Sequence, residues 1–178
     1  MARNRAHEAL RSATADCHRK VDAIYSGARL DDRLSYGNFL LAQAAALLPV
    51  EAALDQSGIA DLVEDWPERI RGPKLIRDIV ELGIARPEPL RRPTLSGPPE
   101  MLGALYVLEG SRLGGKLLRR SVPSDFPTHF LAGESSGSWA SFLMRLDQII
   151  DTDAERSGAI DSARAVFSVF EMTGRLYL

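Results

Sequence analysis

The sequence predicts an all-α protein, a single-domain irregular bundle of helices over residues 1–178. Strand signals are scarce, because β-branched residues are scattered and no Asn-Gly or Asp-Gly turn joins two alternating apolar runs. Apolar residues instead recur at spacings of three and four along several segments, which is the period of an amphipathic α-helix. The chain length is that of one domain with one hydrophobic core.

The N-terminal half carries the first helical signals. Residues 6–25 are expected to form a helix whose apolar stripe consists of Leu10, Ala13, Cys17, Val21 and Ile24. Ser35 is expected to cap a second helix, Pro49 to kink it and Gly58 to end it. A weaker segment runs to Trp66, and Pro73 suits the first turn of a further helix that reaches Leu82.

The C-terminal half begins with a loop, since residues 85–99 hold too many prolines and glycines for a regular element. Residues 99–120 form a long predicted helix. After a second stretch rich in helix breakers, 121–137, two more helices are expected over residues 139–149 and around residues 160–170. A bundle of this kind binds ligands between its helices, in an apolar site with a few polar groups.

Charge and cysteine content exclude several classes of protein. The chain has 22 Lys and Arg against 24 Asp and Glu, with neither sign in a long block, so nucleic acid is not an expected partner. No stretch approaches the roughly 18 apolar residues of a membrane span, and we expect a soluble, cytoplasmic protein without a membrane partner. Cys17 is the single cysteine, which excludes an internal disulfide, a CxxC redox pair and a thiolate metal cage.

His18 is the one histidine of three that lies in the interior of a strongly periodic helix, whereas His7 stands at the start of the same helix. At about 100° per residue it shares a polar stripe with Arg11, Thr14, Asp22 and Tyr25. Asp22, at i+4, can accept the proton of the ring nitrogen that does not bind a metal. Arg11 lies about 10 Å before His18 along the axis, the distance from a metal at the centre of a ring system to a carboxylate at its edge. The alternative is an ordinary surface contact between His18 and Asp22.

The helix over residues 99–120 contains glycines that each cost roughly 0.5–1 kcal/mol relative to alanine, so packing or a ligand must compensate for them. Gly103, Gly110 and Gly114 lie at offsets of 0, 7 and 11 and share one face, along which a flat ligand could approach the backbone. The alternative is close packing of two helices, since Gly110 and Gly114 form a small-xxx-small pattern.

Two polar residues flank Gly110 in an otherwise apolar run, which favours a functional site. They are Glu109 and Ser111. A buried Glu109 would need a cationic partner, and Arg112 or Arg119 is expected to supply it.

These two helices carry a resemblance to the haem oxygenases. Residues 10–22, LRSATADCHRKVD, are similar to the proximal helix of that family, in which a histidine follows an L-x-x-A-T run. Residues 106–116, YVLEGSRLGGK, resemble the distal helix, above all that of bacterial members with a Y-x-x-E-G-S-x-L-G pattern. Residues 163–170, ARAVFSVF, are similar to the last core helix of the family. The resemblance spans nearly the whole chain, with the motifs in the right order.

The resemblance implies that haem lies between a proximal helix and a glycine-rich distal helix, with His18 as the iron ligand. Ser111 stands where many members carry an aspartate that organises proton-delivering water, and bacterial members with serine there are active. Arg145 is a candidate for a second propionate contact. The residues expected to bind haem are Arg11, Thr14, His18, Asp22, Tyr106, Gly110, Gly114 and Phe167. Those expected to take part in the reaction are Ser111, Gly110 and Gly114.

The implied activity is oxidative degradation of haem by dioxygen to biliverdin, ferrous iron and carbon monoxide, with haem as both substrate and cofactor. The sequence has no GxGxxG motif, flavin signature or iron–sulfur cysteines, so electrons are expected from a ferredoxin or a reductase. The chain is similar to short haem oxygenases that accompany bacterial phytochromes, which makes a bacteriophytochrome a candidate acceptor of biliverdin.

Two other functions are consistent with a helical bundle. A haem carrier or sensor would bind haem through His18 without turnover. A helical di-iron or thiaminase-like protein is disfavoured, because di-iron bundles use Glu-x-x-His pairs and no histidine here has a glutamate three residues before it.

Overall fold

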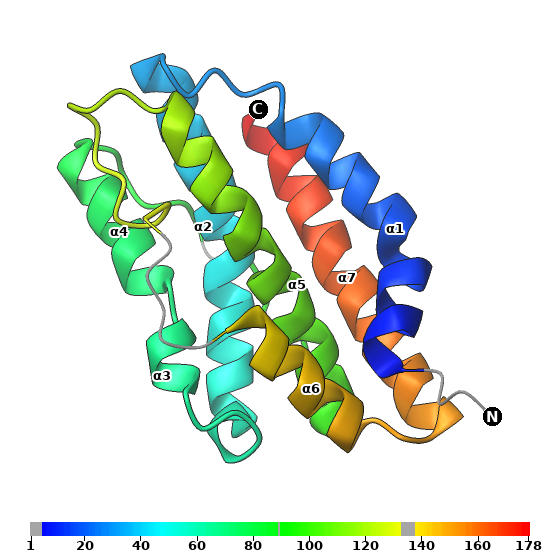
Figure 1. Ribbon diagram of the computed structural model, residues 1–178. Helices are drawn as coiled ribbons and strands as arrows, with labels where there is room; N and C mark the ends of the chain where they lie inside the picture. Colours follow the sequence, from blue (N-terminus) through cyan, green and yellow to red (C-terminus); the bar gives the residue numbers. More distant parts are fainter. Residues whose placement is uncertain (1–4, 89, 133–137) are drawn as a thin grey trace.

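The computed structural model describes residues 5–88, 90–132 and 138–178, and within these ranges it contains helices and no strands. Three long helices run in the same direction: α1 (Ala6–Tyr25), α5 (Pro98–Leu118) and α7 (Asp153–Tyr177) (Figure 1). α7 lies between α1 and α5 and packs against both. The all-helical bundle predicted from the apolar period is confirmed.

α2 (Arg33–Gln56) runs in the opposite direction and is largely buried against α7 and its other neighbours. Its N-cap is Asp32, whose carboxylate accepts a hydrogen bond from the Ser35 backbone amide, so the prediction of Ser35 as the cap is wrong by three residues. Gly58 follows the helix in a left-handed conformation at φ 79°, as predicted.

Among the described helices, α2 is the one long and apolar enough to cross a membrane by length and composition, so the expectation that no stretch approaches a membrane span is wrong. In the bundle, however, 72% of its most apolar window is buried. A helix that is apolar all round and covered on most sides is typical of the core of a soluble protein.

Three short helices, η1 (Ile59–Asp61), α3 (Trp66–Arg69) and α4 (Gly72–Glu81), follow α2, and α4 packs beside it (Figure 1). Pro73 occupies the first turn of α4, as predicted. Gly83, at φ 70°, follows the end of α4. The described residues from 84 to 96 then form neither helix nor strand, which confirms the predicted loop.

After α5 come η2 (Arg119–Ser121) and α6 (Trp139–Ile149). α7 is longer than the predicted stripe, because a capping box of Thr152 and Glu155 starts it well before residue 160. Near its other end α7 meets α1 closely: a Cβ at Gly174 would lie 2.7 Å from the Ile24 side chain. This contact fixes α1 on α7, and with it the position of the polar face of α1.

Candidate functional site

His18 lies on the exposed side of α1, and its side chain is 58% exposed. Its Nδ1 is 2.8 Å from Oδ2 of Asp22, one turn further along the helix. The ring also meets Phe167 of α7 edge-on, with 6.0 Å between ring centroids and an interplanar angle of 71°. Asp22 and Phe167 therefore orient the ring, and the contact of Nδ1 leaves Nε2 as the nitrogen that can bind a metal.

Two of the residues predicted to share a polar stripe with His18, Thr14 and Tyr25, are buried in the structure. Thr14 is 2% exposed and its hydroxyl donates to a backbone carbonyl one turn earlier, at 2.8 Å. Tyr25 is buried against α7, and burial raises the pKa of its hydroxyl to about 12. On the helix these two lie on one side of His18, whereas Arg11 and Asp22 lie on the other. The first side faces the core, so Thr14 and Tyr25 lie beneath the polar face of α1, and Thr14 as a haem-binding residue stays a prediction.

The positive charge of Arg11, in the N-terminal part of α1, acts on Tyr106 of α5. Burial raises the pKa of the Tyr106 hydroxyl, and the positive charge of Arg11 opposes that rise. Tyr106 also packs against Trp139 of α6, with ring centroids 5.5 Å apart. α1 and α5 run in the same direction. His18 lies about 10 Å beyond Arg11 along α1, and residues 110–114 lie about 6–12 Å beyond Tyr106 along α5. The two helices therefore place His18 level with the glycines.

The three glycines on one face of α5 have different surroundings. A Cβ at Gly103 would lie 2.1 Å from the backbone oxygen of Ala159 on α7, so Gly103 permits close packing of the two helices. A Cβ at Gly110 or at Gly114 would meet no atom within 4 Å among those described. At Gly103 the glycine therefore serves helix packing, and the prediction that this residue faces a ligand is wrong. At Gly110 and Gly114 the packing interpretation fails, because no described atom lies against them.

The open part of this face is apolar. Leu113 and Leu117 lie within about 60° of Gly110 around the helix and are 47% and 66% exposed. A surface that lacks side chains at its centre and carries leucines at its margin suits a planar, apolar ligand. The C-terminal part of this face, beyond the contact of Gly103 with α7, is therefore open and fits a macrocycle.

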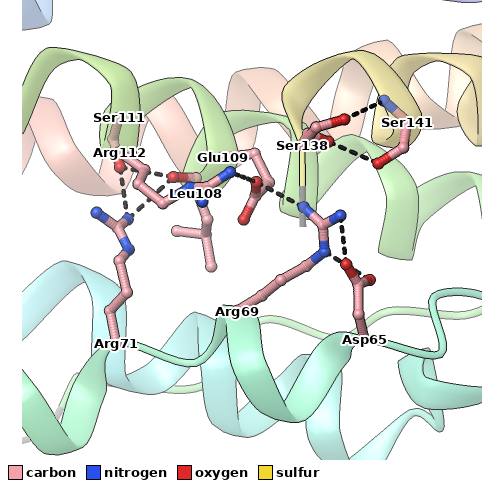
Figure 2. Close-up of polar contacts among 9 residues, drawn as sticks. All are labelled: Asp65, Arg69, Arg71, Leu108, Glu109, Ser111, Arg112, Ser138 and Ser141. Atoms are coloured by element: carbon pink, nitrogen blue, oxygen red, sulfur yellow. Dashed lines mark hydrogen bonds and ion pairs between the residues drawn. The ribbon is translucent and has the colours of Figure 1, made fainter. Parts of the chain in front are cut away.

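The opposite side of α5 carries a cluster of buried charges (Figure 2). Glu109 is 2% exposed and accepts hydrogen bonds from Arg69 at 2.7 Å and from Arg112 at 2.6 Å. Arg69 makes two further bonds, both of 2.8 Å, to Asp65. Arg112 was one of the two partners expected for Glu109. Arg69, from α3, was not expected, because no periodic pattern marks the segment that contains it.

Ser111 is held by a residue that the sequence did not indicate. Nη2 of Arg71 donates to the Ser111 hydroxyl at 2.7 Å and to the Leu108 carbonyl at 2.9 Å, and the Ser111 hydroxyl donates to the same carbonyl at 2.8 Å (Figure 2). Arg71 lies between α3 and α4. The one signal for it is a second arginine two residues after Arg69, directly before a Gly-Pro pair.

Arg145, the candidate for a second propionate contact, lies on α6 and points elsewhere. Its Nε donates to the backbone carbonyl of Leu62, at 3.0 Å, in the segment before α3. The candidate site residues that lie along α1, α5 and α7 are therefore Arg11, His18, Asp22, Tyr106 and Phe167, together with the open glycines.

Comparisons with known proteins bear on this arrangement. No family model matches the chain. A protein named heme oxygenase from Xanthomonas campestris pv. campestris (strain 8004) is 34% identical over 115 residues, which are 59% of this chain and 67% of that protein.

Two solved structures share the fold. The NO- and CO-bound heme oxygenase from Neisseria meningitidis aligns with a TM-score of 0.84 at 21% identity, over 98% of this chain and 92% of the other. Heme oxygenase from Leptospira interrogans aligns with a TM-score of 0.74 at 16% identity, over 95% and 98%. This chain and the two solved structures share one fold. The Xanthomonas protein, at 34% identity, is the relative that shows the family. The chain belongs to the haem oxygenase family.

Proposed function

We propose that this chain binds haem as its substrate and degrades it with dioxygen to biliverdin, ferrous iron and carbon monoxide. The observation that carries the proposal is the register of α1 and α5: the charge of Arg11 acts on Tyr106, and from the rise per residue His18 then stands level with the open residues 110–114. The axial distance of about 10 Å matches that between iron and propionate groups. Membership of the haem oxygenase family supports the same reaction.

On the α1 side, His18 would bind the iron through Nε2. Asp22 accepts the proton of Nδ1, which fixes the tautomer and makes the ring a stronger donor to the metal. Phe167 supports the ring from α7 and would contact the macrocycle. The high exposure of His18 is then a property of the free protein, because haem would cover the imidazole.

On the α5 side, Gly110 and Gly114 would let the macrocycle approach the backbone, while Leu113 and Leu117 exclude water from its face. Arg11 and Tyr106 would bind a propionate by a charge-assisted and a neutral hydrogen bond. Bound haem supplies the iron at which dioxygen is reduced and the ring carbon that is oxidised. Ser111 and ordered water would handle the protons in place of an aspartate.

We further propose cytoplasmic partners for the reaction. Electrons would come from a ferredoxin or a reductase, since the sequence carries no redox motif of its own. A bacteriophytochrome is the proposed acceptor of biliverdin, and the likeness of the chain to short bacterial haem oxygenases supports it.

Titration of the purified protein with hemin tests the binding step. The wild type is expected to give a one-to-one complex with a Soret band, and His18→Ala is expected to lose the spectrum of a histidine-ligated iron. His129→Ala is the matched control, because this half-exposed histidine contacts Glu81 on another part of the surface and should leave the spectrum unchanged. An unaltered spectrum in His18→Ala would reject His18 as the ligand.

Turnover is tested separately, by supplying the complex with ascorbate or reduced ferredoxin in air. The expected result is loss of the Soret band together with the appearance of a biliverdin band. A complex that is stable under these conditions, or that bleaches without biliverdin, would leave a carrier or sensor as the function.

A further inference from the structure

We propose that Arg71 is a positioning residue of the haem site: it fixes the Ser111 hydroxyl as a hydrogen-bond acceptor and places a buried positive charge behind the open face of α5, which favours anionic ligands on the iron. The inference rests on the proposed function, because it requires haem to lie against this face. The guanidinium of Arg71 would thus do part of the work of the aspartate that many family members carry at the position of Ser111.

The hydrogen bonds of Ser111 leave it one way to act. A hydroxyl has one proton to donate and two lone pairs. The proton of Ser111 goes to the Leu108 carbonyl and one lone pair receives Nη2 of Arg71. The remaining lone pair can accept a hydrogen bond, so Ser111 can hold a water molecule but cannot itself donate a proton into the site. Such a water keeps its second hydrogen free to donate to a ligand on the haem.

The position of Ser111 connects this bond to the open face. Ser111 directly follows Gly110 and lies about 60° from Gly114 around the helix, and it is partly exposed. It therefore stands at the margin of the face that receives no side chain, with Arg71 on its far side. Water on Ser111 would lie between the guanidinium and a ligand on the iron.

The backbone and ring contacts of Arg71 hold it rigidly. Its side chain is 7% exposed, and its guanidinium lies 5.0 Å from the centroid of the Phe130 ring. The carboxylate of Glu51 accepts hydrogen bonds from the backbone amides of Arg71 and Gly72, at 2.8 and 2.9 Å. These bonds fix the backbone of Arg71. A side chain fastened at both ends needs little reorganisation when a ligand binds.

The charge of Arg71 is less neutralised than that of its neighbours. Arg69 and Arg112 both pair with Glu109, whereas no carboxylate of a described residue lies within ion-pair distance of the Arg71 guanidinium. Burial lowers the pKa of Arg71 to about 10, and the positive charge of Arg112 acts in the same direction. The negative charges of Glu51 and Glu109 oppose this shift. Arg71 therefore remains a cation at neutral pH, in surroundings of low dielectric constant where its field is weakly screened.

Azide binding to the ferric haem complex, at fixed pH and ionic strength, tests the proposal. Arg71→Met removes the charge and keeps the alkyl stem, and it is expected to weaken azide binding about tenfold. Arg71→Lys keeps the charge and should stay within about threefold of the wild type. Ser111→Ala removes the water anchor but leaves Arg71 its bond to Leu108, and it should weaken azide binding about threefold. Nitric oxide, a neutral ligand, should bind all four proteins equally.

The outcomes separate this proposal from the proposed function. Azide affinity in Arg71→Met equal to that of the wild type would overturn the role of Arg71, as would an equal loss for azide and nitric oxide. If Arg71→Met does not fold, an unchanged azide affinity in Ser111→Ala overturns the role in its place. A wild-type chain that forms no haem complex rejects the proposed function, and this inference with it, before any variant is made.

Discussion

The two helices that would enclose haem, α1 and α5, differ in how deeply their polar groups are buried. On α1, His18 and Asp22 are 58% and 64% exposed, and their contact is one that any surface helix can make. Behind α5, Glu109 and the Arg69 side chain are each 2% exposed and belong to one continuous set of ion pairs (Figure 2). The α1 groups stabilise the free protein little, whereas the α5 cluster is part of its core.

Glu109→Ala tests the buried side of this comparison and should have the largest effect on stability. It leaves Arg69 without one partner and deprives Arg112 of its bond to the carboxylate, so the free energy of unfolding should fall by about 3–5 kcal/mol. Urea denaturation of the haem-free protein measures it. Glu171→Ala is the control, since its i,i+4 pair with Arg175 is worth only a few tenths of a kcal/mol. Equal losses in the two variants would show that the buried cluster does not stabilise the fold.

Gly103→Ala should have the next largest effect, because its Cβ would meet the Ala159 backbone of α7 at 2.1 Å. Backbone cannot yield as a flexible side chain does, and overpacking of this kind costs about 1–3 kcal/mol or more. Thermal unfolding of the haem-free protein should show the loss. A variant as stable as the wild type would mean that α5 and α7 can move apart without cost.

Gly110→Ala lies on the same face and is expected to act in the opposite direction. Its Cβ meets nothing, so the haem-free protein should gain about 0.5–1 kcal/mol from the better helix former. Haem should bind more weakly, because the methyl group occupies the space of the macrocycle. Paired measurements of unfolding and of hemin affinity check both signs. If hemin affinity is unchanged, haem does not lie on this part of α5.

The sequence predicted the helices and failed where a contact depends on distant segments. The long apolar stripes and the breakers Gly58 and Pro73 are local signals, and the corresponding helices are found close to their expected bounds. α7 exceeded its stripe because Thr152 and Glu155 form a capping box that the apolar period does not include.

The site divides in the same way. His18 with Asp22, and the glycines of α5, follow from spacing on single helices. Thr14 is only about 40° from His18 on the helix, and which flank of α1 faces the core is decided by α7. Arg71 acts 40 residues away in the sequence, on Ser111, so no local pattern could connect the two.

Asp22→Asn tests the exposed side of the comparison and should change stability least. In the haem-free protein the loss should be a few tenths of a kcal/mol, because the pair with His18 is solvated. In the ferrous haem complex the weaker acceptor on Nδ1 makes His18 a poorer donor, and the iron–histidine stretching frequency should fall. Resonance Raman spectroscopy measures it. Asp16→Asn, on the same helix and paired with Arg19, is the control: it should lose a similar few tenths of a kcal/mol but leave the iron–histidine frequency unchanged. An identical frequency in Asp22→Asn and the wild type would reduce Asp22 to a surface residue, and α1 would then contribute to the site through His18 and Arg11 alone.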